Sequence, residues 1–358
     1  MARHLGIKDR SARQQLQRSF PRVGIQPLPQ PYSPRRVKAA DVGATDPGEP
    51  LSFFVLGDVG GIKAPGPQNA VSVAMEQRQA EAAFALILGD VVYFNGQEMA
   101  LVNGEQTGYT DQFYEAYAKL VLPIVAFPGN HDGDPQPGDT SLAGFMANFC
   151  DTKPQTPPED PQLEFGRHTQ TLPYCEWTLE LDAATIVAVY TNVPSGGHLE
   201  PDQVDRLTLE LKDADPGKPV IVCLHHPPYS IDAHHGGSQH MGDALDQAFG
   251  DSGRTPDLVL SGHVHDYQRF TRAIGDKQVP YIVSGNGGYH NLHKLASDAS
   301  PGDKLADGVT FEYGDASQYG FLKLTVAGGK ISGEYIGAKP GTMPDGSDAQ
   351  ITPAVETF

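Results

Sequence analysis

Short apolar runs recur along the chain from Leu51, and each ends in a polar cluster. Runs of this length that are bounded by glycine or polar residues are typical of buried strands. Between several of them lie amphipathic stretches that predict helices, at 68–84, 110–120 and 201–213. Short strands that alternate with helices predict a layered α/β fold. The apolar runs are LSFFVLGD, FALILGD, PIVAFPGNHD, PVIVCLHHP and LVLSGHVH.

Later segments alternate apolar and polar residues, as YCEWTLELDAATIVAVYTN and YGFLKLTVAGGKISGEYIG do, and predict strands and hairpins. The sheets should therefore mix parallel and antiparallel pairing. Three segments show little periodicity. We expect residues 1–50 to be a basic, proline-rich arm, residues 133–168 a surface insertion, and residues 338–358 a tail. The folded domain would then span 51–337.

Charge limits the partners that this chain can have. The 358 residues include 26 Lys and Arg against 44 Asp and Glu, a formal net charge of −18, and residues 1–40 are basic. The rest of the chain is therefore strongly acidic and repels polyanions, which makes nucleic acid or an anionic membrane an unfavourable partner. A phosphate-containing substrate would need local cations.

Three cysteines in a chain of this length do not describe a disulfide-stapled domain. Free thiols are expected, with a Cys150–Cys175 disulfide as the alternative. The first twenty residues lack the apolar stretch of a signal peptide, and no run of 18 apolar residues occurs. These features predict a soluble, cytoplasmic protein.

Polar side chains follow the apolar runs where each predicted strand ends. Open α/β sheets bind ligands at the carboxyl ends of their strands, so these side chains could converge on one site. Taken singly, an aspartate after a glycine is commonly a turn or cap residue, and a lone histidine there is commonly structural. The five strand ends offer Asp58, Asp90 with Tyr93, Asn130 with His131, His225 with His226, and His263 with His265.

The donor types at these strand ends favour a metal site. Carboxylates, a carboxamide, a phenol and imidazoles form an oxygen and nitrogen ligand set that suits iron, manganese or zinc. On an extended segment, His263 and His265 would point to the same side and could bind adjacent metals. Two metals that share one bridging carboxylate need about eight ligand contacts. Seven suitable residues are present.

Five sequence blocks carry a resemblance to a known family. In their order and spacing they resemble the signature blocks of the calcineurin-like metallophosphoesterases, in the form found in purple acid phosphatases. The resemblance covers about residues 51–337, the expected catalytic domain, and implies a four-layer α/β/β/α sandwich with mixed sheets. The blocks are GDVG (57–60), GDVVY (89–93), GNHD (129–132), VCLH (222–225) and GHVH (262–265).

Two metal ions follow from this resemblance. Other members have a histidine where Gly60 stands, whereas Tyr93 occupies the position of the tyrosine in purple acid phosphatases. A phenolate ligand implies iron(III) at the first site, and the second resembles a divalent site for iron, zinc or manganese. The implied ligands are Asp58, Asp90, Tyr93 and His265 for the first ion, and Asp90, Asn130, His225 and His263 for the second.

The resemblance also implies catalytic histidines. His131 and the pair His234 and His235 resemble substrate-pocket residues, and as cationic imidazoles they would supply local positive charge; a solvated loop is the alternative for the pair. The sequence has Gln268 where the family commonly has glutamate, which would affect support around the ligands. The glycine run 284–290 would let backbone approach the site closely, unless it is an ordinary loop. His240 and His293 receive no role.

The expected function is hydrolysis of small phosphate monoesters, with a metal-bound hydroxide as nucleophile and no covalent phosphoenzyme. A phosphodiesterase that uses manganese or zinc is the alternative within the family. A non-catalytic module that binds metal or phosphate is the alternative outside the enzymes.

Overall fold

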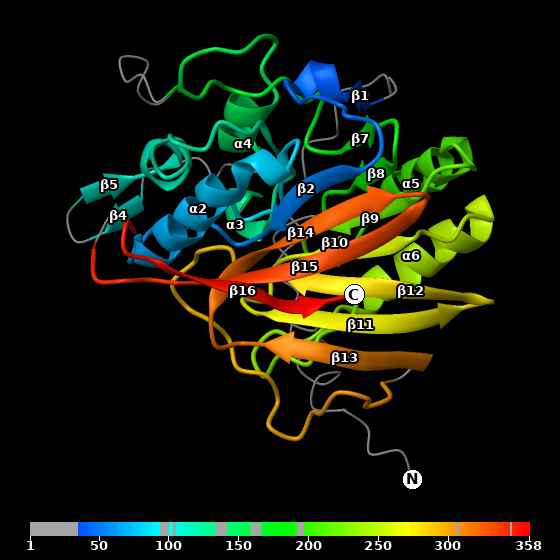
Figure 1. Ribbon diagram of the computed structural model, residues 1–358. Coiled ribbons are helices and arrows are strands. Elements are labelled where there is room, and N and C mark those ends of the chain that lie inside the picture. The colour runs from blue at the N-terminus through cyan, green and yellow to red at the C-terminus, as the bar shows by residue number, and fades with distance from the viewer. Residues whose placement is uncertain are drawn as a thin grey trace.

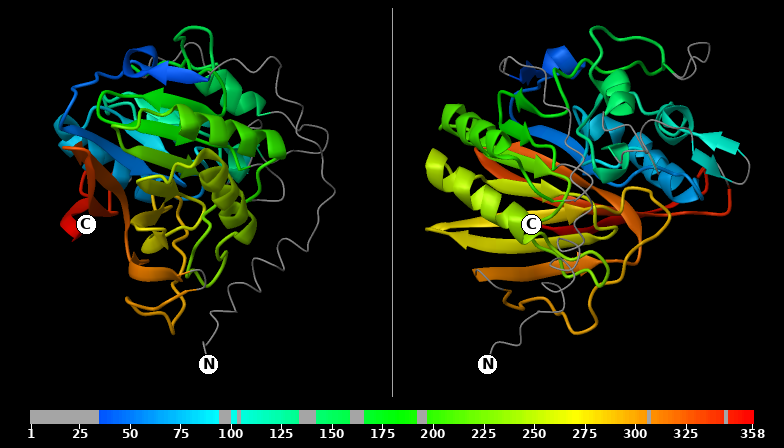
Figure 2. Two further views of the ribbon diagram at one scale, coloured as in Figure 1. Left: turned by 90° about the vertical axis from the view of Figure 1, so that its right-hand side faces the viewer. Right: turned by 180° about the vertical axis from the view of Figure 1, so that it is seen from behind.

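The computed structural model describes residues 35–93, 100–102, 105–133, 142–158, 166–191, 197–305, 308–343 and 346–358. Two large mixed sheets stack face to face, and a separate hairpin pairs β4 (Ala100–Val102) with β5 (Glu105–Thr107) (Figure 1). The expected α/β/β/α layering is confirmed. Figure 2 shows from two further sides that α5 and α6 lie next to each other over one sheet.

The eight-stranded sheet has the order β1-β7-β8-β9-β10-β12-β11-β13. Its strands are β1 (Arg36–Lys38), β7 (Trp177–Glu180), β8 (Thr185–Ala188), β9 (Val220–Leu224), β10 (Leu258–Ser261), β11 (Tyr267–Ile274), β12 (Lys277–Ser284) and β13 (Val309–Asp315). The six-stranded sheet has the order β16-β15-β14-β2-β3-β6. Its strands are β2 (Leu51–Leu56), β3 (Ala85–Ile87), β6 (Ile124–Ala126), β14 (Tyr319–Ala327), β15 (Lys330–Lys339) and β16 (Gln350–Thr357).

Helices cover the outer faces of the two sheets. The helical segments are α2 (Gly66–Arg78), η2 (Gln79–Glu81), η3 (Thr110–Glu115), α3 (Asn130–Gly133), α4 (Ala143–Phe149), α5 (Pro201–Asp213) and α6 (Gln239–Ser252), with η1 (Ala39–Val42) after β1. The predicted helix at 201–213 coincides with α5. The one at 68–84 is α2 followed by the 3-10 turn η2, and the one at 110–120 begins as the π-helix η3.

Successive apolar side chains of β9 point to opposite faces of the sheet, so this strand contributes to two apolar clusters. Val220 and Val222 belong to the cluster beneath α5 and α6, which also contains Leu207 and Met241. Ile221 belongs instead to the larger cluster between the sheets. Because successive side chains of a strand point to opposite faces, a continuous apolar run is buried on both sides.

The carboxyl ends of the central strands meet across the sheet interface. β2, β3 and β6 run parallel in one sheet, and β8, β9, β10 and β12 run parallel in the other. After β2, the Gly57 N–H donates to the Ser284 carbonyl at the end of β12 over 2.7 Å. The strand ends that carry the five blocks therefore lie together.

Three predicted boundaries are wrong in part. The arm expected over 1–50 contributes β1, which pairs with β7, although residues 1–34 lie outside the described residues. The tail expected over 338–358 contains β16, which pairs with β15. The segment 133–168 is not wholly a surface insertion, because Phe145 and Phe149 of α4 are buried in the core. Long-range sheet pairing and aromatic burial override weak local periodicity here.

Cys150, Cys175 and Cys223 are free, as expected. Within the described ranges, no helix has both the length and the apolar character needed to cross a bilayer.

Candidate metal centre

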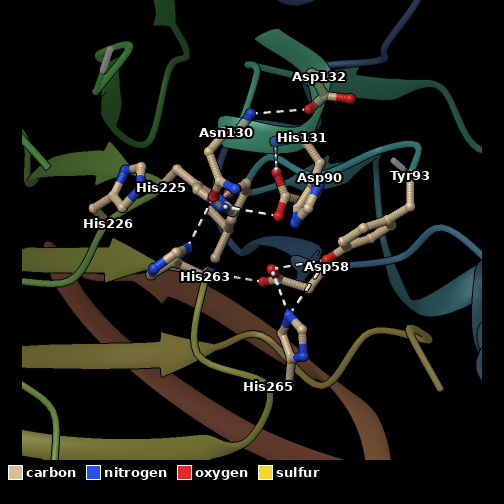
Figure 3. A network of polar contacts seen from close by, with 12 residues as sticks. Asp58, Asp90, Tyr93, Asn130, His131, Asp132, His225, His226, His263 and His265 are labelled. Carbon is tan, nitrogen blue, oxygen red and sulfur yellow. Dashed lines mark hydrogen bonds and ion pairs between the residues drawn. The ribbon is translucent and has the colours of Figure 1, made fainter. Parts of the chain in front are cut away.

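All seven predicted ligands lie at the meeting point of the two sheets (Figure 3). The loops that follow β2, β3 and β6 supply the oxygen side, which is Asp58, Asp90, Tyr93 and Asn130. The loops that follow β9 and β10 supply the nitrogen side, which is His225, His263 and His265.

Three donors of the first predicted site form a triangle. Tyr93 Oη lies 3.3 Å from Asp58 Oδ1 and 3.4 Å from His265 Nε2, and His265 Nε2 lies 3.4 Å from Asp58 Oδ1. Ligands about 2.1 Å from one ion stand about 3.0–3.4 Å apart, for angles between 90° and the tetrahedral value. The triangle therefore matches the edges of a coordination shell.

The donors of the second predicted site form a chain. His225 Nε2 lies 3.3 Å from Asp90 Oδ2 and 3.1 Å from Asn130 Oδ1. Asn130 Oδ1 in turn lies 2.9 Å from His263 Nδ1. One atom each from Asp90, His225 and His263 lies within 4.8 Å of the others. This spacing fits a second ion beside the first.

The tautomers of two histidines require a positive charge, either a proton or a metal ion, between each ring and a carboxylate. His225 Nδ1 lies 2.8 Å from the Leu88 carbonyl, and His265 Nδ1 lies 3.0 Å from the Asn291 carbonyl. Because a carbonyl only accepts, both Nδ1 atoms carry the proton in the neutral rings, and both Nε2 atoms present a lone pair. Those lone pairs face carboxylate oxygens, so either an extra proton or a metal ion must lie between them.

Charges at the centre already compensate one another. Burial opposes ionisation of Asp90, yet His225 and His131 lower its pKa overall. Burial likewise opposes charge on His225, but Asp90 raises its pKa to about 9. With a metal ion in the proton's place, the same electrostatics would hold the ion instead.

Tyr93 becomes a metal ligand only if it ionises. Its side chain is buried, and burial together with Asp90 and Asp58 raises the pKa of the phenol well above its usual value. A multiply charged cation between these groups would reverse the effect of both carboxylates. Asp90 raises the pKa of both Tyr93 and His225, so its carboxylate lies near donors of both predicted sites.

Backbone strain is concentrated at the candidate ligands. Among the described residues, the non-glycine positions with positive φ are Asp58 (58°), Asp90 (52°) and His263 (68°). Each such conformation costs about 1–3 kcal/mol and tends to occur at functional sites. His263 therefore lies in a turn, and the expected extended His-x-His segment is wrong. Its ring contacts Asn130, while the ring of His265 contacts Asp58.

Gly60 explains how Tyr93 fits. A Cβ atom on Gly60 would lie 2.8 Å from Tyr93 Cδ2 and 2.5 Å from Gln112 Oε1. Gln112 holds the Tyr93 backbone from both sides, since its Oε1 accepts the Tyr93 N–H over 3.0 Å and its Nε2 donates to the Tyr93 carbonyl over 2.6 Å. A side chain at position 60 and this placement of Tyr93 therefore exclude each other.

The glycine run after β12 approaches the centre closely, as expected. A Cβ on Gly285 would lie 2.1 Å from the Val264 carbonyl oxygen and 2.8 Å from Asp58 Oδ2. Beyond the run, Tyr289 stacks on Tyr93 with ring centroids 4.0 Å apart, and its N–H donates to the Asp58 carbonyl. The glycine run thus places the Tyr289 ring against that of Tyr93.

The three predicted catalytic histidines border the centre. His131 donates its backbone N–H to Asp90 Oδ1 over 2.8 Å, and its ring lies 4.4 Å from that of Tyr93. His235 lies 4.4 Å from His263 between ring centroids, whereas His234 is exposed. Burial and neighbouring histidines lower the pKa of His235 to about 3, which favours the neutral ring when no substrate is bound.

Several supporting residues were missed by sequence reasoning. Asp132 lies within the GNHD block and accepts backbone N–H groups from Val91, Val92 and Gly129, which ties two blocks together. Gln112 gives no sequence signal, because it reaches the centre from η3. Asp132 could have been found from its place in the block.

Two further histidines and one glutamine surround the nitrogen side. His226 packs 4.2 Å from the His263 ring, and His293 packs 4.3 Å from the His265 ring. Gln268 donates to Asp266 Oδ1 over 2.8 Å and accepts the Ile231 N–H. A glutamate at 268 would repel the Asp266 carboxylate, so glutamine suits this environment and supports the segment next to His265.

Comparisons with known proteins agree with the site. A sequence profile of the calcineurin-like phosphoesterases matches residues 51–267, which include all five blocks. Purple acid phosphatase 22 of Arabidopsis thaliana is 30% identical over 297 residues, covering 78% of this chain and 58% of that protein. Purple acid phosphatase 21 of the same plant is 30% identical over 252 residues, which cover 67% of this chain and 50% of that protein. The chain spans about half the length of these relatives.

Solved structures share the fold. The purple acid phosphatase PPD1 from yellow lupin seeds has a TM-score of 0.59 at 17% identity, over 87% of this chain and 53% of that one. GAP50, described as the anchor in the inner membrane complex of Plasmodium, has a TM-score of 0.56 at 15% identity. The match covers 86% of this chain and 88% of that one. With the family profile spanning every block of the centre, the chain belongs to the calcineurin-like phosphoesterase family and has purple acid phosphatases among its relatives.

Proposed function

We propose that this protein hydrolyses phosphate monoesters at a dinuclear metal centre. The observation that carries the proposal is the convergence of lone pairs at the sheet interface, where two histidine Nε2 atoms face carboxylate oxygens at 3.3 and 3.4 Å. Such a set of acceptors is suited to cations. When bound, two ions clamp a phosphate for in-line displacement and acidify a water molecule.

The donor chemistry suggests which ions bind. A phenolate favours a trivalent ion, so the first site would take iron(III), and the second would take divalent iron, zinc or manganese. The first would use Asp58, Asp90, Tyr93 and His265, and the second Asp90, Asn130, His225 and His263.

The histidines at the border would act on the substrate. A phosphate dianion next to His235 would counter the burial that now keeps this ring neutral, so the ring could gain a proton as substrate binds. His234 and His235 would then hold the phosphate and protonate the leaving oxygen. His131 would orient the phosphate, because its backbone is anchored to Asp90.

Leaving-group dependence tests these roles. A poor alkoxide leaving group needs a proton in the transition state, whereas nitrophenolate hardly does. Alanine at His234 or His235 should therefore lower kcat/KM for alkyl phosphates about 10²–10⁴-fold more than for nitrophenyl phosphate. Alanine at His131 should slow both substrates alike, because positioning is needed whichever group leaves.

Two controls accompany this experiment. Each variant must retain two metals by elemental analysis, and a chelator must abolish wild-type turnover. Unchanged rates for all three variants on both substrates would contradict the roles of these histidines. Turnover that survives complete metal removal would contradict the proposed function itself, and a diester comparison tests the preference for monoesters.

Colour tests the identity of the first ion. Phenolate coordinated to iron(III) absorbs visible light, so the oxidised protein should be coloured and Tyr93→Phe should bleach it. A colourless, iron-free protein from iron-replete cells would instead favour manganese or zinc.

The cytoplasm is the proposed compartment and small phosphate esters are the proposed partners. Three free cysteines support the reducing compartment, and the excess of acidic residues disfavours large polyanions such as nucleic acid as alternative partners. Thiol labelling of freshly isolated protein should modify three cysteines after unfolding; a disulfide between Cys150 and Cys175 would contradict a reducing compartment.

A further inference from the structure

A second group of histidines lies beside the centre and uses residues outside the predicted ligand set. His234 and His235 follow β9, and His293 follows the glycine run after β12. Their ring centroids form a triangle with sides of 4.7, 4.7 and 5.0 Å. One ring nitrogen from each residue lies within 4.8 Å of the other two. Three imidazoles at this spacing can bind one ion.

A buried carboxylate holds this histidine triad together. Asp232 Oδ2 accepts the backbone N–H groups of His234 over 3.0 Å and His235 over 2.6 Å, and it lies 3.3 Å from His293 Nδ1. The Asp232 side chain is 0% exposed. Its Oδ1 is buried and has no hydrogen-bond partner within the described part of the chain. An unpaired carboxylate oxygen without water is costly unless a positive charge lies near it.

We propose that His234, His235 and His293 form a third metal site, selective for zinc-like divalent ions. Three imidazoles that leave one coordination position open are a ligand set that zinc accepts. Asp232 would be the outer carboxylate that orients a metal-binding histidine and raises its basicity. The exposed side chain of His234 provides a path for the ion from solvent.

Occupation of this site has a consequence for the adjoining centre. The ring of His235 contacts that of His263, so the third ion would lie next to the second predicted site. An imidazole nitrogen that binds zinc cannot carry a proton to a leaving group. Excess zinc should therefore inhibit the proposed hydrolysis reversibly. The number of bound zinc ions can be measured whether or not the protein has the proposed activity.

Zinc stoichiometry tests the third site on the full chain that already holds its two ions. Equilibrium dialysis against Zn²⁺ followed by elemental analysis should give a third equivalent in the wild type. His293→Ala and His234→Ala should lack this equivalent, and His240→Ala, which removes an exposed histidine of α6, should keep it. If loss of the His293 ring disturbs the neighbouring His265, His234→Ala is the variant that tests the third site, because the His234 side chain is exposed.

Two further measurements decide the outcome. Asp232→Asn keeps the shape of the side chain, and loss of such an outer partner should weaken zinc binding about 10–100-fold. An anomalous difference map at the zinc edge should place the third ion among the three rings. A wild type that binds only two ions, or a third equivalent that persists in both histidine variants, would overturn the third site without touching the proposed phosphatase activity.

Discussion

The two sheets contribute different chemistry to the candidate centre. The six-stranded sheet supplies the oxygen side, with two carboxylates, a phenol and a carboxamide, while the eight-stranded sheet supplies the nitrogen side, with three imidazoles. The proposed ions would each take ligands from both sides. The centre therefore exists only when the sheets are stacked, and a bound ion would join them.

The two sides are also supported differently. On the oxygen side, Asp58 and Asp90 hold strained backbone conformations, and Gln112 holds Tyr93. On the nitrogen side, backbone carbonyls orient the rings of His225 and His265, and the carbonyl that contacts His225 is that of Leu88, which follows β3 of the opposite sheet. The nitrogen side thus depends on the opposite sheet for the orientation of the His225 ring.

The largest effect is expected from loss of the carboxylate that serves both ions. Asp90→Ala should empty both sites and lower turnover more than about 10³-fold, beyond what loss of a single stabilising donor costs. His263→Ala should mainly empty the second site, because its ring contacts Asn130. Elemental analysis of both variants measures this difference. Full metal occupancy in Asp90→Ala would refute the bridging assignment.

Metal removal should loosen the junction between the sheets. An ion held at about 1,000 times its Kd stabilises the folded state by about 4 kcal/mol, so chelation should lower the melting temperature by several degrees. Calorimetry with and without chelator measures the shift. Asp90→Ala should show no such shift. If chelation does not change the melting temperature of the wild type, the ions do not join the sheets.

A methyl group at position 60 should disturb the oxygen side alone. Gly60→Ala would push against Tyr93 and Gln112, and we expect about 10–100-fold weaker binding of the first ion. Gly250→Ala is the matched control, since nothing lies within 4 Å of its added Cβ on α6. Metal titration followed by the colour of the tyrosinate compares the variants; equal affinities would show that Tyr93 tolerates a side chain at 60.

Loss of a charge at Glu81 in the turn η2, which pairs with Lys323 of the six-stranded sheet away from the centre, should have the smallest effect. Arg78, followed by Lys323, lowers the pKa of Glu81 to about 2. A lowered folded-state pKa contributes stability above the unfolded value of 4.5, and this stability is lost as pH falls toward 2. Because the carboxylate is partly exposed, Glu81→Gln should cost less than about 1 kcal/mol at pH 7.

Urea unfolding at pH 7 and near pH 2 measures that contribution. The difference between wild type and Glu81→Gln should shrink at the lower pH, and metal content should not change. A metal loss in this variant would mean that general charge balance, rather than the strand-end ligands, governs the centre.

Local pattern was sufficient for the central strands and for α5, because burial on two faces or on one helical stripe leaves a strong periodic signal. It failed for β1 and β16, which are edge strands with little apolar content that are held by pairing with β7 and β15. It also failed for α4, whose Phe145 and Phe149 are placed by contacts with residues distant in sequence.

The candidate ligands were predictable for a similar reason. Five blocks that follow buried strands must lie at sheet ends, and their side chains name the chemistry without knowledge of distances. The sequence alone does not show that a side chain at 60 would collide with Tyr93, or that Gln112 holds that tyrosine. Those contacts join residues 33 and 19 positions apart along the chain.

The sequence by itself determined the donors, their order, and the strands that present them, since these depend on side-chain chemistry and short-range periodicity. Only the tertiary structure decided that oxygen donors from one sheet meet nitrogen donors from the other, and that Asp232 gathers three histidines nearby. The physical reason is that the stacking of the sheets is driven by apolar burial, which is non-directional and acts between segments far apart in the chain.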